Sequence, residues 1–392
     1  MKQHVLIAGA SIAGLTAAHW LARAGFAVTV AERTDGPRPG GNGVDLRARA
    51  AEVIELMGLT DRVRAAATDV IGMKFVDAAG RARARIDTRV PGAVEIMRGD
   101  LVGLLASTVE NSSDVEFRFG SPVRALDQDG TGVSVTFDRG ATERFDLVIG
   151  ADGLHSTVRR LAFGPEDRFL HFHGHYFAFA DADPALGEDR WVTMFNRPGR
   201  MAGVYRSGNH PQAKAYFIFR SAPLVYDYRD VDQHRRIVRD AFADDRGWHV
   251  PALLDAATAD PGFYFDSLSQ VRLPAWSTGR IGLVGDAAYC ASPASGAGAE
   301  LAVVGSYRLA AELARADGDH AAAFARYQAA HTPLVRRRHR IGPNVRMMVP
   351  KTRAGSRVRD TLARLPFLTA LGALEGAGEP LSPGIEVPAG RS

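Results

Sequence analysis

Cysteine is nearly absent from this 392-residue chain, in which Cys290 is the only one. One cysteine cannot form an internal disulfide or a Cys-x-x-Cys redox pair, and it excludes a cysteine-rich zinc site. Long apolar runs are missing too. No stretch approaches the roughly 18 consecutive apolar residues that a membrane span needs, so we expect neither a transmembrane helix nor a membrane partner.

Lysine is also scarce and occurs only at positions 2, 74, 214 and 351, although Lys and Arg together number 48 against 44 Asp and Glu. The formal charge of +4 is compatible with anionic small molecules, and no nucleic-acid-binding motif accompanies it. We therefore expect a small-molecule substrate and no nucleic-acid partner. The N-terminal apolar run ends at a Gly-rich turn instead of a cleavage site, so the expected location is cytoplasmic.

The chain opens with a β-α-β pattern. An apolar run at residues 4–8 ends at Gly9, helical spacing follows over 12–24, and a second strand-like run covers 27–31. A unit of this length opens a dinucleotide-binding domain. A Gly- and Pro-rich loop comes next, and we then predict helices over 48–57 and 99–111 and strands around positions 116, 133 and 147.

The middle of the chain has a different pattern. Between about 168 and 270 lie period-two, aromatic-rich runs at 171–180, 191–196 and 213–219, which predict an inserted antiparallel sheet. After Pro274 a strand at 281–284 and an Ala-rich helix from about 299 continue the first domain. The predicted fold class is α/β, with a discontinuous Rossmann-like domain (1–166 and 275–350), an inserted antiparallel β-sheet substrate domain (167–274), and C-terminal helices and tail (351–392).

The turn after the first strand reads Gly9-Ala10-Ser11-Ile12-Ala13-Gly14, a Gly-x-Gly-x-x-Gly fingerprint in which Ser11 replaces the middle glycine. Such a turn lets the backbone approach a pyrophosphate, which the helix N-terminus attracts. A carboxylate at the tip of the second strand accepts hydrogen bonds from ribose hydroxyls and repels a 2′-phosphate. The unit predicts FAD or NAD, with contacts from Gly9, Ser11, Ile12, Ala13, Gly14, Glu32 and Arg33.

A second motif runs from Asp146 to Gly153 and continues through Ser156 and Arg159. It resembles the Asp-Gly motif of the single-component, group A flavoprotein monooxygenases, which have the fold of para-hydroxybenzoate hydroxylase. In that family the motif contacts both FAD and a transiently bound nicotinamide cofactor. The resemblance therefore implies that Asp152 and Gly153 contact the cofactor and that the discontinuous domain binds FAD.

Residues 279–288, Gly-Arg-Ile-Gly-Leu-Val-Gly-Asp-Ala-Ala, are similar to the family's Gly-Asp motif. By that resemblance Asp286 hydrogen-bonds the ribityl chain of FAD, and a loop with Pro293, Gly296, Ala297 and Gly298 follows the flavin ring. The helix that starts there can stabilise negative charge on reduced flavin with its free N–H groups. Tyr289 stands where many relatives carry His, and Ala297 where many carry Gln.

Two arginines extend the resemblance. Arg98 begins an Arg-x-x-Leu pattern whose arginine reaches the ribose or phosphate region of FAD in the family. The segment 43–58 resembles the one beside the flavin ring in aromatic polyketide hydroxylases and tetracycline-inactivating monooxygenases. Arg47 is the candidate in that segment for contact with flavin or nicotinamide.

Three histidines, His171, His173 and His175, alternate with other residues. On a regular strand they share one face, where they could bind a metal, line a substrate cavity or pack in a core. No further ligand cluster is evident, so we expect no metal and assign His173, His175 and Phe177 to substrate binding.

The resemblance implies that NAD(P)H, as co-substrate, reduces FAD, that O2 adds at flavin C4a, and that the hydroperoxide hydroxylates an aromatic ring. The resemblance of segment 43–58, together with the aromatic residues of the inserted region, implies a polycyclic phenolic substrate, such as a polyketide intermediate or a related antibiotic. Core packing of the same aromatic residues is the competing explanation. The sequence identifies no catalytic base, and we expect a monomer or weak homodimer.

Two alternatives on the same fold stay open: an FAD-dependent reductase or dehydrogenase, and a drug-binding flavoprotein without turnover. A halogenase is disfavoured because the chain lacks a Trp-x-Trp-x-Ile-Pro segment.

Overall fold

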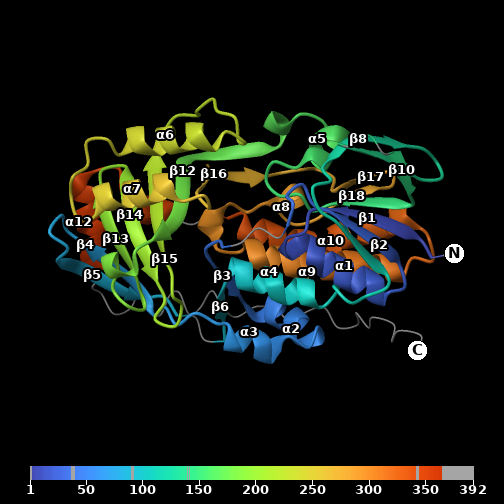
Figure 1. Cartoon of the computed structure of the whole chain (residues 1–392), viewed down its shortest axis with the longest axis horizontal. Coiled ribbons are helices and arrows are strands. Elements are labelled where there is room, and N and C mark those ends of the chain that lie inside the picture. Colours follow the sequence, from blue (N-terminus) through green and yellow to red (C-terminus); the bar gives the residue numbers. More distant parts are fainter. Residues whose placement is uncertain are drawn as a thin grey trace.

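The computed structural model describes residues 2–36, 40–89, 92–138, 140, 142–340 and 344–363. Within these ranges two large sheets lie side by side, a six-stranded one that is mainly parallel and a seven-stranded one that is mixed (Figure 1). We call them the parallel sheet and the mixed sheet. They confirm the predicted α/β fold class, while the tail predicted at the C-terminus lies outside the described residues.

The parallel sheet has the strand order β17-β18-β11-β1-β2-β7, and all its pairs are parallel except β17 with β18. Its strands are β1 (His4–Ala8), β2 (Ala27–Ala31), β7 (Val115–Arg118), β11 (Leu147–Gly150), β17 (Ser277–Thr278) and β18 (Ile281–Leu283). Ala8, Gly150 and Leu283 lie next to one another at the carboxyl ends of three adjacent strands. The three glycine-bearing motifs follow these strand ends, which is where ligands bind to open parallel sheets.

Helices and smaller sheets surround the parallel sheet. The longer helices are α1 (Ile12–Arg23), α4 (Arg98–Ser107), α9 (Gly298–Ala314) and α10 (His320–Arg338), and the shorter ones are α2 (Ala48–Leu56), α3 (Thr60–Ala65), α5 (Thr157–Phe163) and α8 (Asp286–Tyr289). The smaller sheets are a ribbon of β3 (Gly43–Leu46) with β6 (Val94–Met97), and an antiparallel group of β8 (Val123–Gln128), β9 (Val133–Phe137) and β10 (Thr142–Phe145). In the part of the chain that the structure describes, no helix is long and apolar enough to cross a bilayer.

The mixed sheet has the order β16-β12-β15-β14-β13-β4-β5 and is antiparallel except where β13 pairs with β4. Its strands are β4 (Gly72–Val76), β5 (Ala82–Asp87), β12 (Leu170–Ala182), β13 (Trp191–Arg197), β14 (Arg200–Arg206), β15 (Ala213–Arg220) and β16 (Tyr264–Val271). The three predicted aromatic strands are confirmed as β12, β13 and β15. The sheet also takes β4 and β5 from residues 72–87, inside the segment that the sequence assigned to the FAD-binding domain.

Different elements pack against the two faces of the mixed sheet. One face carries Tyr176, Phe217 and Phe219 and is covered by α6 (Val231–Ala241) and α7 (Val250–Ala259) (Figure 1). The opposite face carries Phe177 and Ile218, and residues of α11 (Asn344–Met348) and the loop residue Ala294 pack against it. This second face therefore lies toward the 293–298 loop of the parallel-sheet domain. The last described helix is α12 (Arg353–Leu362), within the segment 351–392 that was predicted to hold C-terminal helices and a tail.

Candidate cofactor and substrate site

Glycine is required where the three motif turns meet. A Cβ on Gly9 would lie 2.6 Å from the carbonyl oxygen of Ala151, and one on Gly14 would lie 1.8 Å from the carbonyl oxygen of Gly9. A Cβ on Gly285 would lie 2.7 Å from that of Ala13. These short distances show that the first turn packs directly against the turns that follow β11 and β18. No residue larger than glycine fits at these three positions.

The N-terminus of α1 keeps its N–H groups available. Ser11 is the N-cap residue, but its side chain makes no capping hydrogen bond and instead accepts one from Arg98 Nη2 at 2.7 Å. Ile12 and Ala13 in the first turn are buried beside it. An uncapped helix N-terminus of this kind attracts anions such as a pyrophosphate.

The start of α5 contrasts with that of α1. Asp152 accepts hydrogen bonds from the backbone N–H groups of Thr157 at 2.7 Å and Val158 at 3.1 Å, and Ser156 Oγ accepts one from Arg159 at 2.9 Å. The carboxylate of Asp152 therefore fastens its turn to α5. The neighbouring Gly153 has a φ of +84° and open space where a Cβ would stand, so a ligand can approach the backbone there.

Glu32 lies beside the first turn. Its Oε2 accepts from the backbone N–H of Ala10 at 2.9 Å, and its Oε1 accepts from that of Thr34 at 3.1 Å. Oε1 also accepts from Thr34 Oγ1 at 3.2 Å. A carboxylate has roughly four acceptor positions, so one remains for a ribose hydroxyl. Arg33, the next residue, is exposed.

The 293–298 loop exposes backbone inside an otherwise buried region. Pro293, Gly296 and Gly298 are exposed, whereas the N-cap residue of α9, Ala297, is fully buried and its helix has no side-chain cap. The backbone N–H of Ala297 donates to Ser295 Oγ at 3.2 Å. Asp286, the first residue of α8, keeps an exposed surface, and desolvation by the surrounding protein raises the pKa of its carboxyl, which the Cys290 thiol and Arg98 partly offset.

Arg47 reaches the same loop. Its Nη2 pairs with Asp45 Oδ2 at 2.9 Å and lies 3.8 Å from where a Cβ on Gly296 would stand. Gly296 has a φ of +61°, which favours glycine as well. The structure thus brings Arg47 to the 293–298 loop and Arg98 to the first turn.

The family described as FAD binding domain matches residues 2–337. The chain belongs to the FAD-binding-domain family. A flavin-dependent monooxygenase of Legionella longbeachae serogroup 1 is 36% identical over 330 residues, which are 83% of this chain and 84% of that protein. Tetracycline destructase Tet(51) is 33% identical, and its crystal structure matches 96% of this chain with 98% of its own at a TM-score of 0.83. Klebsiella pneumoniae HpxO, solved with FAD and uric acid, is 20% identical and shares the fold, with a TM-score of 0.72 over 95% of this chain and 96% of its own.

The site of this FAD-binding-domain protein fits FAD in two ways. The uncapped N-termini of α1 and α9 offer two positions for negative charge, which suit the pyrophosphate and the reduced flavin. Glu32 suits a ribose without a 2′-phosphate. When FAD is bound, it brings the redox chemistry that no side chain in this site supplies.

Aromatic side chains cover the face of the mixed sheet that lies toward the 293–298 loop. The ring centroids of Phe179 and Tyr264 are 5.0 Å apart, those of Phe177 and Tyr264 5.5 Å, and those of Tyr216 and Tyr205 6.3 Å. We call these residues the aromatic face: Phe177, Phe179, Tyr205, Tyr216 and Tyr264. The sequence predicted only Phe177 among them, although the period-two spacing that placed Phe177 also applied to Phe179.

His173 and His175 of β12 lie in a bulge, whereas His171 pairs regularly with Gln270. Phe172 pairs with Ser269 and Tyr176 with Ser267, so β12 holds extra residues between these pairs, and Gly174 there has a φ of +74°. The bulge breaks the regular alternation of side chains along β12. The prediction that the three histidines share one face of the strand required that alternation. His173 lies beside Arg272, burial lowers its pKa, and its backbone oxygen is 2.8 Å from His175 Nδ1. No cluster able to hold a metal occurs among the residues that the structure describes.

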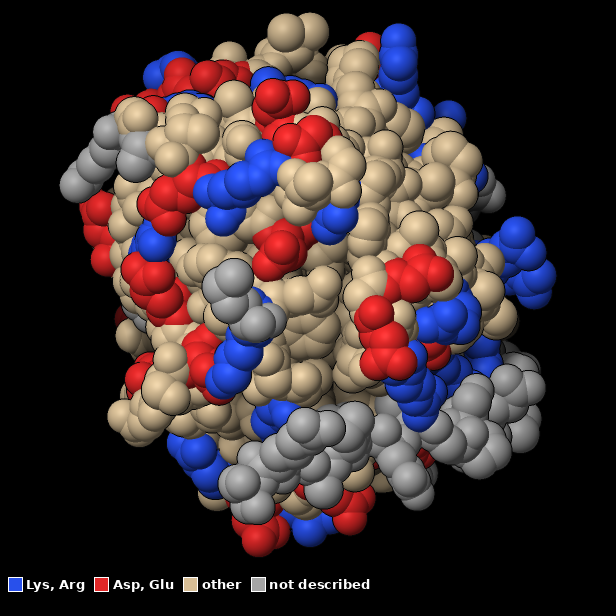
Figure 2. Space-filling model, turned by 90° about the vertical axis from the view of Figure 1, so that its right-hand side faces the viewer, with Lys and Arg blue, Asp and Glu red and all other residues tan. Residues whose placement is uncertain are grey.

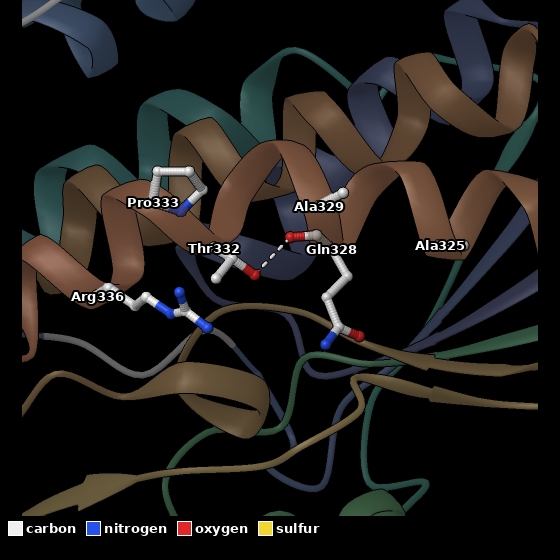
Figure 3. A pocket seen from close by; sticks show the side chains of 6 residues that line it. All are labelled: Ala325, Gln328, Ala329, Thr332, Pro333 and Arg336. Carbon is white, nitrogen blue, oxygen red and sulfur yellow. Dashed lines mark hydrogen bonds between the residues drawn. The ribbon is translucent and has the colours of Figure 1, made fainter.

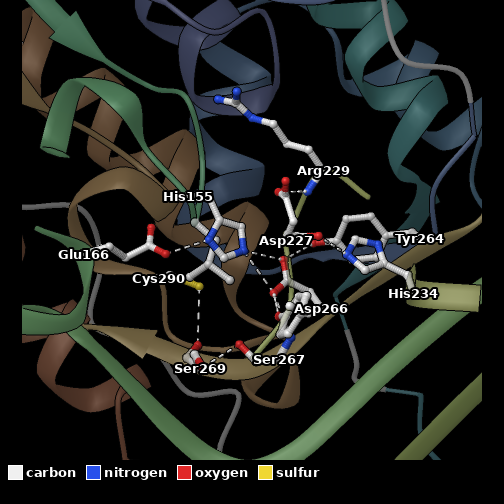
Figure 4. Close-up of polar contacts among 12 residues, drawn as sticks. His155, Glu166, Asp227, Arg229, His234, Tyr264, Asp266, Ser267, Ser269 and Cys290 are labelled. Carbon is white, nitrogen blue, oxygen red and sulfur yellow. Dashed lines mark hydrogen bonds and ion pairs between the residues drawn. The ribbon is translucent and has the colours of Figure 1, made fainter. Parts of the chain in front are cut away.

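A charged cluster missed by the sequence reading joins the Asp-Gly turn to the mixed sheet (Figure 4). His155 lies between two carboxylates, with Nδ1 2.8 Å from Glu166 and Nε2 3.2 Å from Asp266. Burial alone would lower the pKa of His155, but hydrogen bonds and charge from Asp266 and Glu166 raise it to about 9. Tyr264 of the aromatic face also donates to Asp266, at 3.0 Å.

A hollow along α10 contains none of the predicted site residues. It is lined by Ala325, Gln328, Ala329, Thr332, Pro333 and Arg336 (Figure 3). Gln328 is already engaged there, since it accepts from the N–H of Trp276 at 3.0 Å and donates to the carbonyl of Pro274 at 2.9 Å. On the end of the molecule seen in Figure 2, acidic and basic side chains are interspersed and form no field of one sign.

Proposed function

We propose that this protein is an FAD-dependent monooxygenase that uses NAD(P)H and O2 to hydroxylate an aromatic, polycyclic phenolic substrate. One observation carries the proposal: the aromatic face lies toward the 293–298 loop, and Ala294 of that loop packs against the cluster containing Phe177. A flat ring bound there is stacked on aromatic side chains beside the flavin. The resemblance to a tetracycline destructase supports a fused-ring substrate.

Each part of the site has a task in this reaction. FAD, reduced by NAD(P)H, supplies the oxygen-activating chemistry when it is bound, and its C4a-hydroperoxide is the oxygen donor that we assign. The first turn, Glu32 and Arg98 hold the adenosine diphosphate half, and Asp286 the ribityl chain. The N-terminus of α9 favours negative charge near the flavin. The aromatic face orients the substrate ring and excludes water from it.

The test is a substrate panel on the purified holoprotein. Tetracycline and alizarin represent fused-ring phenols, and para-hydroxybenzoate represents a single-ring acid. We expect the fused-ring phenols to accelerate NADH or NADPH oxidation and to gain one oxygen atom in mass analysis, while para-hydroxybenzoate does neither. Efficient hydroxylation of para-hydroxybenzoate with no response to any polycycle would contradict the substrate class.

The same panel separates the two alternatives. A drug-binding flavoprotein without turnover binds the fused-ring compounds and leaves NAD(P)H oxidation unchanged. A reductase or dehydrogenase consumes the nicotinamide or reduces the flavin and yields a product without added oxygen. The monooxygenase proposal requires both oxidation and oxygen gain in one reaction.

A further inference from the structure

The β3/β6 ribbon connects the 293–298 loop to the aromatic face. Asp45 and Glu95 stand opposite each other in the pairing of the two strands and therefore point to the same side. Asp45 Oδ2 lies 3.9 Å from where a Cβ on Gly296 would stand, and Glu95 contacts Tyr205 of the mixed sheet. A carboxylate on this ribbon is thus placed between the expected flavin and the expected substrate.

Glu95 is held through one of its two carboxylate oxygens. Its Oε2 accepts from Thr68 Oγ1 at 2.8 Å and from the Tyr205 hydroxyl at 3.1 Å. Its Oε1 receives no hydrogen bond from any residue that the structure describes. The carboxylate is therefore fixed in orientation while one oxygen keeps its acceptor capacity.

That oxygen lies against Gly43. A Cβ at this position would lie 2.4 Å from Glu95 Oε1 and 3.1 Å from the Tyr205 hydroxyl. Since Gly43 is not at a positive φ, a turn does not explain the glycine. Glycine at position 43 therefore lets the Glu95 carboxylate lie directly against the backbone of β3.

The surroundings of Glu95 favour proton acceptance. Burial raises the pKa of Glu95, and the charge of Asp45 on β3 raises it further, against the hydrogen bonds from Thr68 and Tyr205. Burial and the nearby Glu95 also raise the pKa of Tyr205 on β14 and of Tyr216 on β15, so both hydroxyls stay neutral. Arg47, the residue that follows β3, is paired with Asp45.

We propose that Glu95 is a catalytic residue that takes the proton of a phenolic hydroxyl of the bound substrate. This inference rests on the proposed function and assigns it a base. The phenol O–H bond breaks, the proton goes to Oε1, and the electron pair stays on the phenolate oxygen, so the step needs no oxidant. The ring becomes more electron-rich and more reactive toward an electrophilic oxygen. Thr68 and Tyr205 are positioning residues that hold Oε2.

The first experiment measures ionisation without turnover. Alizarin changes colour when its phenol ionises, so its absorbance in complex with oxidised holoprotein reports where the proton is. We expect wild-type protein to bind alizarin as the phenolate at pH values where free alizarin is neutral. Glu95→Gln should bind the neutral form. The exposed Glu110→Gln serves as the matched control and should behave as wild type.

The second experiment measures catalysis by Glu95→Gln. Loss of a general base lowers kcat by about 100-fold or more, with FAD content and melting temperature unchanged, and removes the acidic limb of the pH profile. Tyr205→Phe should keep that limb, because the base remains.

Three outcomes would overturn the inference. Wild-type protein that binds neutral alizarin refutes it without any variant. A Glu95→Gln protein with wild-type colour and pH profile refutes it while leaving the monooxygenase function intact. Failure of every fused-ring phenol to bind wild-type protein refutes the substrate class, and the assignment of Glu95 with it.

Discussion

Arg98 Nη2 donates a hydrogen bond to Ser11 Oγ at 2.7 Å, and this bond explains how the first turn functions without its middle glycine. A serine at an N-cap ordinarily satisfies the N–H groups of its own helix. Here Arg98, the first residue of α4, holds the hydroxyl instead, and the N–H groups of α1 remain for a phosphate. Arg98 also acts electrostatically on Asp286, so it connects the first and third motifs.

Arg98→Ala should weaken FAD binding by about tenfold or more, because it removes a cation near the pyrophosphate and frees Ser11 to cap α1. Fluorescence titration of apoprotein with FAD measures the dissociation constant. Arg62→Ala is the matched control, since Arg62 Nη1 donates to Ser107 Oγ at 2.9 Å on the surface. Equal FAD affinity in both variants would show that Arg98 is a surface residue without a cofactor role.

Asp286→Ala should lower FAD affinity by about 1 to 3 kcal/mol, the scale of a hydrogen bond to a charged group. The assignment rests on the resemblance of residues 279–288 to the family's Gly-Asp motif, and Asp286 is exposed at the start of α8. The exposed Asp240→Ala on α6 is the control. If flavin retention on a desalting column is the same for Asp286→Ala and wild type, Asp286 does not hold the ribityl chain.

Gly14→Ala and Gly103→Ala should have opposite effects. A methyl on Gly14 would lie 1.8 Å from the Gly9 carbonyl oxygen, so the substitution should destabilise the protein by more than about 2 kcal/mol and impair FAD binding. Gly103 in α4 has open space around it, and alanine there should stabilise by about 0.5 to 1 kcal/mol. Urea denaturation measures both, and a neutral Gly14→Ala would contradict the packing of the first turn.

His155 should make the stability depend on pH. Its pKa is raised from 6.5 to about 9 in the folded protein, so its contribution is fully present below pH 6.5 and is lost as the pH rises through about 9. The contribution is about 3 kcal/mol at most. His155→Gln should therefore lose stability relative to wild type at low pH and little above pH 9, with the exposed His171→Gln as control. A pH-independent difference would show that protonation of His155 plays no part.

The sequence predicted the elements of the fold better than their long-range pairing. The β-α-β opening, the aromatic strands and the return of the first domain after Pro274 follow from local periodicity and glycine positions. The parallel pairing of β13 with β4 does not, because nothing local to residues 72–76 specifies a partner more than a hundred positions away. The bulge in β12 had one local signal, Gly174 inside a strand-like run.

The residues of the candidate site also fall into two groups, those with a local sequence signal and those without one. Motif turns are local, so Gly9, Gly14, Asp286 and the 293–298 loop could be placed from sequence alone. Glu95 and Asp266 carry no motif, and their partners Tyr205 and His155 are distant in the chain. Only the folded arrangement brings such pairs together, which is why the sequence identified a cofactor but no base.

The source of the oxygen in the product tests the central claim most directly. Holoprotein is incubated with NAD(P)H and the fused-ring phenol that best stimulates oxidation, once under ¹⁸O-labelled O2 and once in ¹⁸O-labelled water. A monooxygenase incorporates one labelled atom from O2 and none from water. A product that carries its label from water, or none at all, would contradict the account.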